Sequence, residues 1–210
     1  MIAFLAIALG SYLIGSIPSG YLAGRLAGID IRTTGSGNIG ATNVTRAVGK
    51  RYGYPVFLAD FSKGLSAVLI PKLISHHLFA SPNSAQLLQI VAGFFCVLGN
   101  AFPVWLHFRG GKGMATSAGV IFGLMPLPAL VGVVVWVVTF KITRYVSLAS
   151  IAASVAMPVI VIAMIYFKLI TEPLLLYVSI GLAALVVLRH RSNISRLIRG
   201  TEERVRRSED

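Results

Sequence analysis

Seven apolar stretches separated by short polar connectors constrain this 210-residue chain more than any other feature of its sequence. An α-helix needs about 20 apolar residues to cross a bilayer, and somewhat fewer where it is short or the bilayer is thin. With 56% hydrophobic and 12% charged residues, the chain carries too much apolar surface to bury in one soluble core. The sequence therefore predicts an all-α polytopic membrane protein, a bundle of seven transmembrane helices in a single domain over residues 1–210. The predicted spans are 2–23, 54–74, 86–108, 114–124, 127–140, 147–167 and 174–188.

The distribution of basic residues predicts how the bundle is oriented, because short cytoplasmic loops carry an excess of Lys and Arg. Sixteen of the 19 basic residues fall on one side of the predicted membrane. They occupy the loops at 25–53, 109–113 and 141–146 and the tail at 189–210. Seven spans then place the N-terminus outside and the C-terminal tail in the cytosol. The net charge of +12 does not indicate nucleic-acid binding, since the charges lie between apolar spans rather than along one basic face.

A glycine-rich run at 35–46, Gly-Ser-Gly-Asn-Ile-Gly-Ala-Thr-Asn-Val-Thr-Arg, lies in the first predicted cytosolic loop. Glycine lets the backbone approach a ligand closely, and hydroxyl and carboxamide side chains add hydrogen bonds. Arg46 adds a forked cation, so the run suits an anion. Its candidate ligand-binding residues are Gly35, Ser36, Gly37, Asn38, Thr42, Asn43 and Arg46.

A second run, Phe-Arg-Gly-Gly-Lys-Gly-Met at 108–114, directly precedes the predicted helix 114–124. The N-terminus of a helix carries roughly half a positive charge, and flanking glycines with a lysine make it a phosphate-binding site. The spacing is not that of a P-loop and no parallel sheet is predicted, so nucleotide hydrolysis is not expected. The candidate phosphate-binding residues are Gly110, Gly111, Lys112 and Gly113, and the tail adds His190, Asn193 and Arg196 on the same predicted face.

Several common catalytic signatures are absent from the sequence. No histidine is followed five residues later by aspartate, and neither a G-x-S-x-G elbow nor an H-E-x-x-H motif occurs. The carboxylates do not cluster, so neither a metal nor another cofactor is expected. An enzyme with this inventory must rely on electrostatic positioning of a phosphate-bearing substrate and on a reagent that is already activated, such as an acyl phosphate.

Two readings other than an enzyme remain open from the residues alone. A transporter or exchanger of a small phosphorylated metabolite also combines basic residues with broken helices, but the polar residues here gather at one membrane face and no repeat is present. A structural membrane scaffold would leave the two glycine-rich runs without a role. Asp60 and Lys63, three residues apart in one span, are equally compatible with structural support and with lining a site.

The motifs together resemble the bacterial acyl-phosphate:glycerol-3-phosphate acyltransferase family, the PlsY family. The resemblance rests on Gly-Ser-Ile-Pro-Ser-Gly-Tyr, Gly-Ser-Gly-Asn-Ile-Gly-Ala-Thr-Asn, Phe-Arg-Gly-Gly-Lys-Gly-Met-Ala-Thr, Thr-Arg-Tyr-Val-Ser-Leu-Ala-Ser and Arg-His-Arg-Ser-Asn-Ile-Ser-Arg-Leu, in order over nearly the whole chain. It implies a seven-helix enzyme of the bacterial inner membrane with its active site on the cytosolic side. Such an enzyme transfers an acyl chain from acyl phosphate to the sn-1 hydroxyl of glycerol 3-phosphate, the first step of phospholipid biosynthesis. The products are lysophosphatidic acid and phosphate.

The same resemblance implies roles for residues of both glycine-rich runs. Ser36 and Arg46 are implied to be needed for catalysis. The loop 110–113, with Lys112, is implied to bind the phosphate of glycerol 3-phosphate, and Thr116 and Ser147 to complete that site.

In the tail, the resemblance places His190 and Asn193 at the active site and gives Glu202 the role of holding the cytosolic face together. Either the leaving phosphate or His190 accepts the proton of the attacking hydroxyl. Acyl phosphate, glycerol 3-phosphate and membrane lipid are the implied partners. The enzyme that makes acyl phosphate, or an acyl-carrier protein, is a further candidate to dock on the cytosolic loops.

Overall fold

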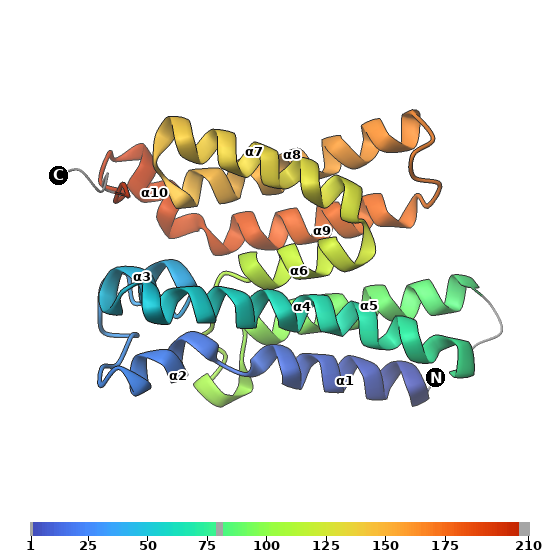
Figure 1. Cartoon of the computed structure of the whole chain (residues 1–210), viewed down its shortest axis with the longest axis horizontal. Coiled ribbons are helices and arrows are strands. Elements are labelled where there is room, and N and C mark those ends of the chain that lie inside the picture. Colours follow the sequence, from blue (N-terminus) through green and yellow to red (C-terminus); the bar gives the residue numbers. More distant parts are fainter. Residues whose placement is uncertain (1, 79–81, 206–210) are drawn as a thin grey trace. The chain divides into compact units, whose positions relative to one another are not determined.

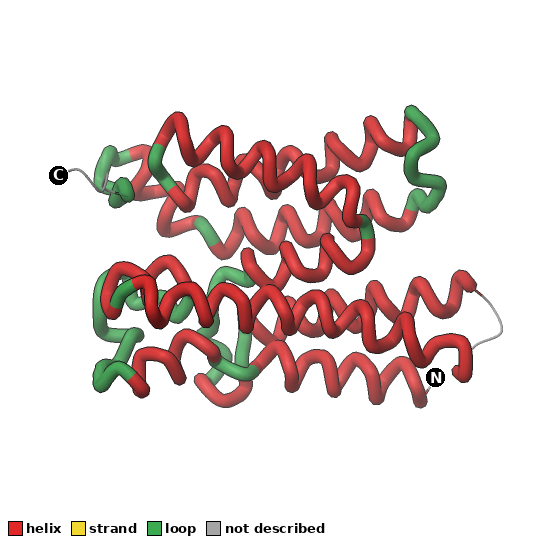
Figure 2. Tube along the Cα trace, in the orientation of Figure 1, coloured by secondary structure: helices red, strands yellow, loops and turns green. Residues whose placement is uncertain are grey.

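The computed structural model describes residues 2–78 and 82–205, without the side chains of 75–78 and 82–83. Within this part of the chain every element is a helix or a loop, which confirms the predicted all-α class (Figures 1 and 2). The helices are α1 (Ile2–Ser16), α2 (Ser19–Leu26), α3 (Ala41–Val48), α4 (Lys50–Leu78), α5 (Pro82–Ala101), the 3₁₀ turn η1 (Val104–Leu106), α6 (Met114–Leu124), α7 (Pro126–Thr143), α8 (Val146–Tyr166), α9 (Leu174–Arg189) and α10 (Arg191–Ile198).

Four helical segments of the described chain are long and apolar enough to cross a membrane: Ile2–Leu26, Ser84–Leu106, Pro126–Thr143 and Val146–Tyr166. The pair α9 and α10, bent by 59°, makes a fifth if it is counted as one span. The short apolar helix α6 has 11 residues. A membrane protein of several apolar helices is therefore confirmed, whereas the count of seven spans and the orientation of the termini stay predictions.

The predicted cytosolic connection 25–53 contains helical structure that the sequence did not indicate: the end of α2, all of α3 and the start of α4. In α3 the side chains of Asn43 and Val44 are buried while Thr42 and Arg46 are exposed. This amphipathic helix is too short and too polar to be found by searching for apolar spans. In the same way, α7 extends into the predicted connector 141–146, and α10 lies within the predicted tail.

The chain forms two compact units, Met1–Leu124 and Met125–Asp210. That both belong to one domain stays a prediction. In the first unit, α1 packs against α5, and α4 packs against both α5 and α6. Glycines permit these approaches: a Cβ on Gly64 of α4 would overlap the carbonyl of Thr116, and one on Gly119 of α6 would overlap that of Phe61.

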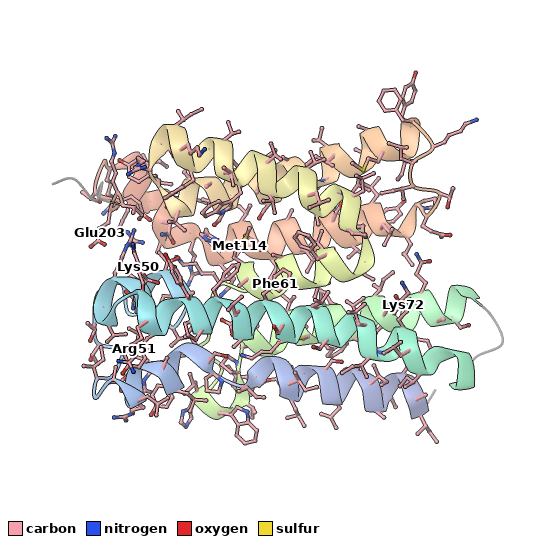
Figure 3. The ribbon with its side chains drawn as sticks, in the orientation of Figure 1. Lys50, Arg51, Phe61, Lys72, Met114 and Glu203 are labelled. Carbon is pink, nitrogen blue, oxygen red and sulfur yellow. The ribbon has the colours of Figure 1, made fainter. Side chains whose placement is uncertain are left out.

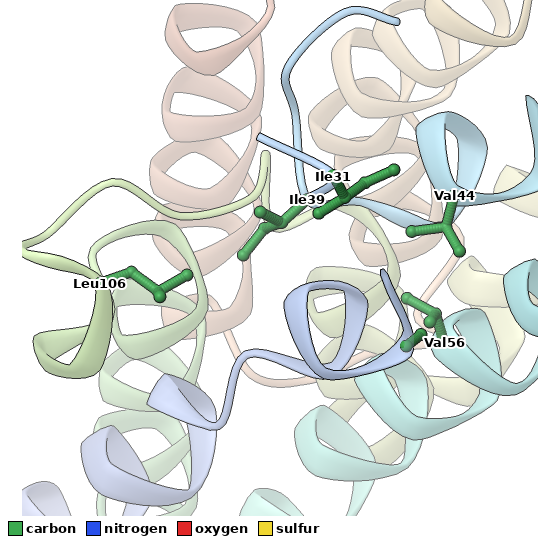
Figure 4. Close-up of a cluster of buried hydrophobic side chains, with 6 residues drawn as sticks. Ile31, Ile39, Val44, Val56 and Leu106 are labelled. Atoms are coloured by element: carbon green, nitrogen blue, oxygen red, sulfur yellow. The ribbon is translucent and has the colours of Figure 1, made fainter. Parts of the chain in front are cut away.

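One end of the first unit carries a cluster of buried apolar side chains that we call the site floor: Ala23, Ile31, Ile39, Val44, Val56 and Leu106 (Figure 4). These residues come from α2, the segment between α2 and α3, α3, α4 and η1. The cluster therefore ties the first glycine-rich segment, through Ile39, and the turn η1 before the second one to the helices. Lys50 and Arg51 lie at the same end of α4, far along the helix from Lys72 (Figure 3).

In the second unit, α8 packs against both α7 and α9, and α10 contacts α8 and α9. Trp136 of α7 donates its indole N–H to the hydroxyl of Ser150 in α8, at 3.2 Å. The segment after α10 folds back, because the Val205 N–H donates to the Arg144 carbonyl beyond the end of α7, at 3.0 Å. The start of α8 and the residues around α10 are thereby brought to one end of this unit.

Candidate active site

Asn43 organises the first glycine-rich segment, which we call loop 1 (residues 35–40). Its Oδ1 accepts the Ser36 N–H at 2.9 Å. Its Nδ2 donates to the carbonyls of Asn38 at 2.8 Å and Thr34 at 3.0 Å. The side chain is only 3% exposed, so this carboxamide is held by the backbone of the loop it supports. Asn43 was predicted to bind substrate, but the structure gives it contacts that shape loop 1.

Three of the six backbone N–H groups of loop 1, those of Ser36, Gly37 and Gly40, are used inside the chain. The Gly37 N–H donates to the Thr34 carbonyl, and the Gly40 N–H to Oδ1 of Asn38. Gly35 has a φ of 60°, and a Cβ there would lie 2.5 Å from Oδ1 of Asn43. The glycines are therefore required by the path of the backbone, and the expectation that they offer N–H groups to an anion does not hold for Ser36, Gly37 and Gly40.

Three side chains of this region point away from the core and remain exposed: Ser36 in loop 1, and Thr42 and Arg46 in α3. Thr42 and Arg46 are four residues apart, so they share one face of α3. The opposite face, with Asn43 and Val44, is buried. The fold thus offers a hydroxyl and a guanidinium to solvent from a helix that is fixed at its back.

Sequence reasoning missed the residue that fixes the turn before loop 1. Asp30 accepts the backbone N–H of Arg32 at 3.0 Å and forms an ion pair with its guanidinium at 2.6 Å. The hydrogen bond from the Arg32 side chain, together with the backbone bond, lowers the pKa of Asp30 well below its usual range. Aspartate two residues before a donor N–H is a common turn signal, which could have identified this position.

The second glycine-rich segment, loop 2 (residues 109–113), is held against the end of α5. The Gly111 N–H donates to the Asn100 carbonyl at 3.1 Å, and a Cβ on Gly110 would overlap that same carbonyl. The preceding residues His107 and Phe108 both have left-handed backbone, with φ of 51° and 61°. Non-glycine residues adopt this conformation at a cost, and two hydrogen bonds hold the turn: the Phe108 N–H donates to the Pro103 carbonyl at 3.0 Å and the Arg109 N–H to the Leu106 carbonyl at 3.1 Å.

Loop 2 leads directly into the N-terminus of α6. Gly113 has a φ of 73°, which L side chains rarely adopt, and Met114 begins the helix. Lys112 is half-buried beside this terminus. In the first turn the Thr116 hydroxyl is fully buried and has no hydrogen-bond partner among the described residues. A buried hydroxyl without a partner is costly, and a ligand at the start of α6 would supply one.

The second unit contains a polar network centred on Glu202. Its Oε1 accepts the Ser147 hydroxyl at 2.6 Å and Nδ2 of Asn193 at 2.7 Å. Its Oε2 accepts Nε of Arg196 at 2.7 Å. Burial raises the pKa of Glu202, but the hydrogen bonds from Ser147, Asn193 and Arg196 lower it more, so the net pKa lies below the ordinary value.

This network determines how Asn193 is presented. Because its Nδ2 is directed at the carboxylate, its Oδ1 is left as an acceptor, and this buried atom has no partner among the described residues. The ring of His190, one turn away and 3% exposed, contacts the Val186 carbonyl through Nδ1 at 2.7 Å. A carbonyl only accepts, so a neutral His190 carries its proton on Nδ1 and would accept a further proton on Nε2.

The structure thus brings the predicted site residues together in two groups. In the first unit, loop 1 contributes Ile39 to the site floor, and a Cβ on Gly111 of loop 2 would lie 3.9 Å from the Ile39 side chain. In the second unit, Ser147, His190 and Asn193 gather around the junction of α8, α9 and α10. Ser147 was predicted to bind substrate, and its hydroxyl proton is donated to Glu202.

The fold and these basic, glycine-rich loops define an integral membrane protein with polar chemistry at the ends of apolar helices. The chain matches the family model described as glycerol-3-phosphate acyltransferase over residues 5–200. It belongs to this family. It is 46% identical over 202 residues to a glycerol-3-phosphate acyltransferase of Geotalea daltonii, covering 96% of this chain and 97% of that protein. A relative of the same name from Aquifex aeolicus is 43% identical over 92% of this chain and 95% of its own length.

Solved structures give the same result. A crystal structure of PlsY, described as an integral membrane glycerol 3-phosphate acyltransferase in its glycerol 3-phosphate form, is 41% identical and has a TM-score of 0.83. The match covers 97% of this chain and 96% of that one. A second structure, of the lysophosphatidic acid form, has a TM-score of 0.80. The resemblance inferred from the motifs is therefore confirmed, and acyl transfer is favoured over transport.

Proposed function

We propose that this chain transfers an acyl chain from acyl phosphate to the sn-1 hydroxyl of glycerol 3-phosphate. The hydroxyl oxygen forms an ester bond to the acyl carbon, the bond from that carbon to the phosphate oxygen breaks, and phosphate leaves. The products are 1-acyl-glycerol 3-phosphate and inorganic phosphate. The observation that carries the proposal is that loop 2 approaches the site floor at Ile39 of loop 1, where a Cβ on Gly111 would lie 3.9 Å from the Ile39 side chain, so the two glycine-rich segments meet at one end of the first unit.

Lys112 and Arg46 bind the phosphate groups of the two substrates. The positive end of the α6 macrodipole adds to the field of Lys112. Thr116, whose buried hydroxyl has no partner among the described residues, completes the phosphate site next to Lys112. Charged groups that are fixed before the reaction stabilise a developing charge without reorganisation.

Ser36 and Asn193 orient the attacking hydroxyl and the acyl carbonyl. The exposed Ser36 hydroxyl can donate to the carbonyl oxygen, on which negative charge develops. Asn193 presents Oδ1 as an acceptor because Glu202 holds its amide nitrogen, so it can accept a hydrogen bond from a glycerol hydroxyl. Glu202 and Asn43 act by positioning these groups.

The leaving phosphate accepts the proton of the attacking hydroxyl. Phosphate is a good leaving group and a base of suitable strength, so little protein-derived base is needed. If Nε2 of His190 were the base, replacing it would cost about a hundredfold or more in kcat. We expect His190→Ala to lower kcat less than tenfold, and a larger loss together with a lost pH-rate limb would assign the base role to His190.

The enzyme lies in the bacterial inner membrane with seven spans, its N-terminus outside and its active site in the cytosol. Support comes from the concentration of Lys and Arg at the ends of the helices that carry the site. Acyl phosphate, a membrane amphiphile, then presents its head group at the interface where glycerol 3-phosphate arrives from the cytosol.

The donor is tested with purified protein in nanodiscs, labelled glycerol 3-phosphate, and either palmitoyl phosphate or palmitoyl coenzyme A. We expect labelled 1-palmitoyl-glycerol 3-phosphate from palmitoyl phosphate alone. Lys112→Ala should raise KM for glycerol 3-phosphate. Product formation from palmitoyl coenzyme A at an equal rate, or a 2-acyl product, would contradict the proposal.

A further inference from the structure

Asp60 and Lys63 of α4 form a buried ion pair that the proposed chemistry does not use. Each residue is 8% exposed, and Nζ of Lys63 lies 2.8 Å from Oδ1 of Asp60. Nζ also donates to the Ile17 carbonyl and to the Ser19 hydroxyl, at 2.5 Å each. An ammonium has three N–H donors, so these three contacts account for all of them.

The contacts of Lys63 fall at the break between α1 and α2. Pro18 lacks a backbone N–H and cannot continue α1, so carbonyls at the end of that helix lose their usual partners. A broken helix is tolerated inside a membrane protein only where other groups satisfy its backbone. At this break the Ile17 carbonyl accepts the Ser19 N–H and a second hydrogen bond from Lys63, and Asp60 compensates the charge of Lys63.

The position of this break determines where α2 lies under loop 1. Ser19 is the first residue of α2, and Gly20 follows it. Gly20 packs so closely on the Ile39 carbonyl that a Cβ would overlap it. Ile39 belongs to loop 1, and its side chain shares the site floor with Ala23 of α2. Contacts therefore lead from the Lys63 ammonium through α2 to loop 1.

The same turn of α4 also supports loop 2. Gly64, the next residue, packs against the Thr116 carbonyl in the first turn of α6. That turn follows Lys112 and Gly113 directly. A displacement of α4 at residues 60–64 would therefore reach the supports of both loops.

We propose that Lys63, with Asp60 as its counter-ion, is a positioning residue that sets the spacing of loops 1 and 2 for glycerol 3-phosphate. This inference rests on the proposed function, and Lys63 itself contacts no substrate. If the pair only stabilised the fold, the variant that removes both charges would recover catalytic activity together with stability.

The test compares Lys63→Met with Asp60→Asn/Lys63→Met in the full chain, measuring thermal unfolding and phosphate release from palmitoyl phosphate. Lys72→Met, on an exposed turn of the same helix, is the matched control (Figure 3).

Lys63→Met leaves Asp60 as an unpaired buried charge, so its thermal midpoint falls, and the double variant regains much of that loss. A misplacement of about 1 Å costs about a hundredfold, so kcat/KM for glycerol 3-phosphate should fall about a hundredfold in both variants. Recovery of kcat/KM together with stability in the double variant would overturn the proposal.

Hydrogen exchange tests the inference without activity. In Lys63→Met we expect faster amide exchange over residues 19–44, whereas exchange in α8 stays as in the parent protein. Parent-like exchange over 19–44, or equal acceleration in both regions, would overturn the positioning role. If the parent protein transfers no acyl group, the proposed function fails, but the exchange experiment still decides whether Lys63 positions loop 1.

Discussion

Replacing Glu202 with glutamine should destabilise the second unit, because its carboxylate accepts three hydrogen bonds. The donors are the Ser147 hydroxyl, the Asn193 amide and the Arg196 guanidinium, at 2.6 to 2.7 Å. Glutamine keeps the size of the side chain but offers one oxygen and one NH₂ group. If the new NH₂ replaces Oε2, it faces the Arg196 guanidinium, which can only donate. If it replaces Oε1, it faces the Ser147 hydroxyl and the Asn193 amide, which both donate in the parent protein.

The magnitude follows from this mismatch. A hydrogen bond to a charged group contributes about 1.5–3 kcal/mol, so the loss of one such bond costs about 2 kcal/mol. For a chain of 150–250 residues each kcal/mol moves the thermal midpoint by about 2–4 °C, so Glu202→Gln should lower it by about 4–8 °C. Glu172→Gln, the same substitution at an exposed position of the same unit, should lie within about 0.5 kcal/mol of the parent protein.

The assay is thermal unfolding in a mild detergent, with acyl transfer measured below the transition of every variant. Release of Asn193 from Glu202 frees its amide to rotate, so kcat/KM should fall together with the thermal midpoint. A parent-like midpoint for Glu202→Gln would refute the reasoning, since it would mean that the three contacts do not require a charged acceptor.

Acid should have the same effect on the parent protein. The pKa of Glu202 is lower in the folded chain than in the unfolded chain, where it is about 4.3. Its contribution to stability is therefore complete above that value and is lost as the pH falls through the lower folded pKa. Measured over this acid range, the thermal midpoint of the parent protein should converge on that of Glu202→Gln. A constant difference between the two would contradict this assignment.

Two further predictions concern loop 1 and the topology. Gly35→Ala should lower kcat/KM at least tenfold, because the new Cβ meets the Asn43 carboxamide that holds the loop. Gly28→Ala is the control, since Gly28 also has a positive φ but a Cβ there meets nothing within 4 Å, and its loss should be smaller. Equal losses in kcat/KM would mean that backbone strain alone is responsible. In a Cys96→Ser background, Lys50→Cys should react with an impermeant thiol reagent only from the cytosolic side and Lys168→Cys only from outside; the reverse pattern would contradict the predicted orientation.

The sequence predicted those parts of the fold that depend on local composition. The apolar stretches indicated an all-helical membrane protein, whereas anion binding by the two glycine-rich runs stays a prediction. Loop 2 and its helix were predicted closely, since Gly113 stands directly before an uninterrupted apolar helix. The helix α3 was missed because it has only eight residues and carries Thr42 and Arg46 on its exposed face, so a search for long apolar spans does not find it.

Contacts between distant residues could not be predicted. Glu202 lies 55 residues from Ser147, and Lys63 lies 46 residues from Ile17, so no local pattern shows that they meet. The residue types of the run 35–46 suggested ligand binding by Asn43 as much as by Ser36. The structure separates them, because one side chain is buried in backbone contacts and the other is exposed.

The central claim is acyl transfer from acyl phosphate to glycerol 3-phosphate, and phosphate release tests it most directly. Purified protein in nanodiscs is given palmitoyl phosphate with and without glycerol 3-phosphate, beside Lys112→Ala and Ser36→Ala. We predict that phosphate is released only when both substrates are present, in equal amount to the lysophosphatidic acid formed, and is nearly abolished in both variants. No release from palmitoyl phosphate, with counterflow of glycerol 3-phosphate in sealed liposomes, would contradict the account and indicate transport instead.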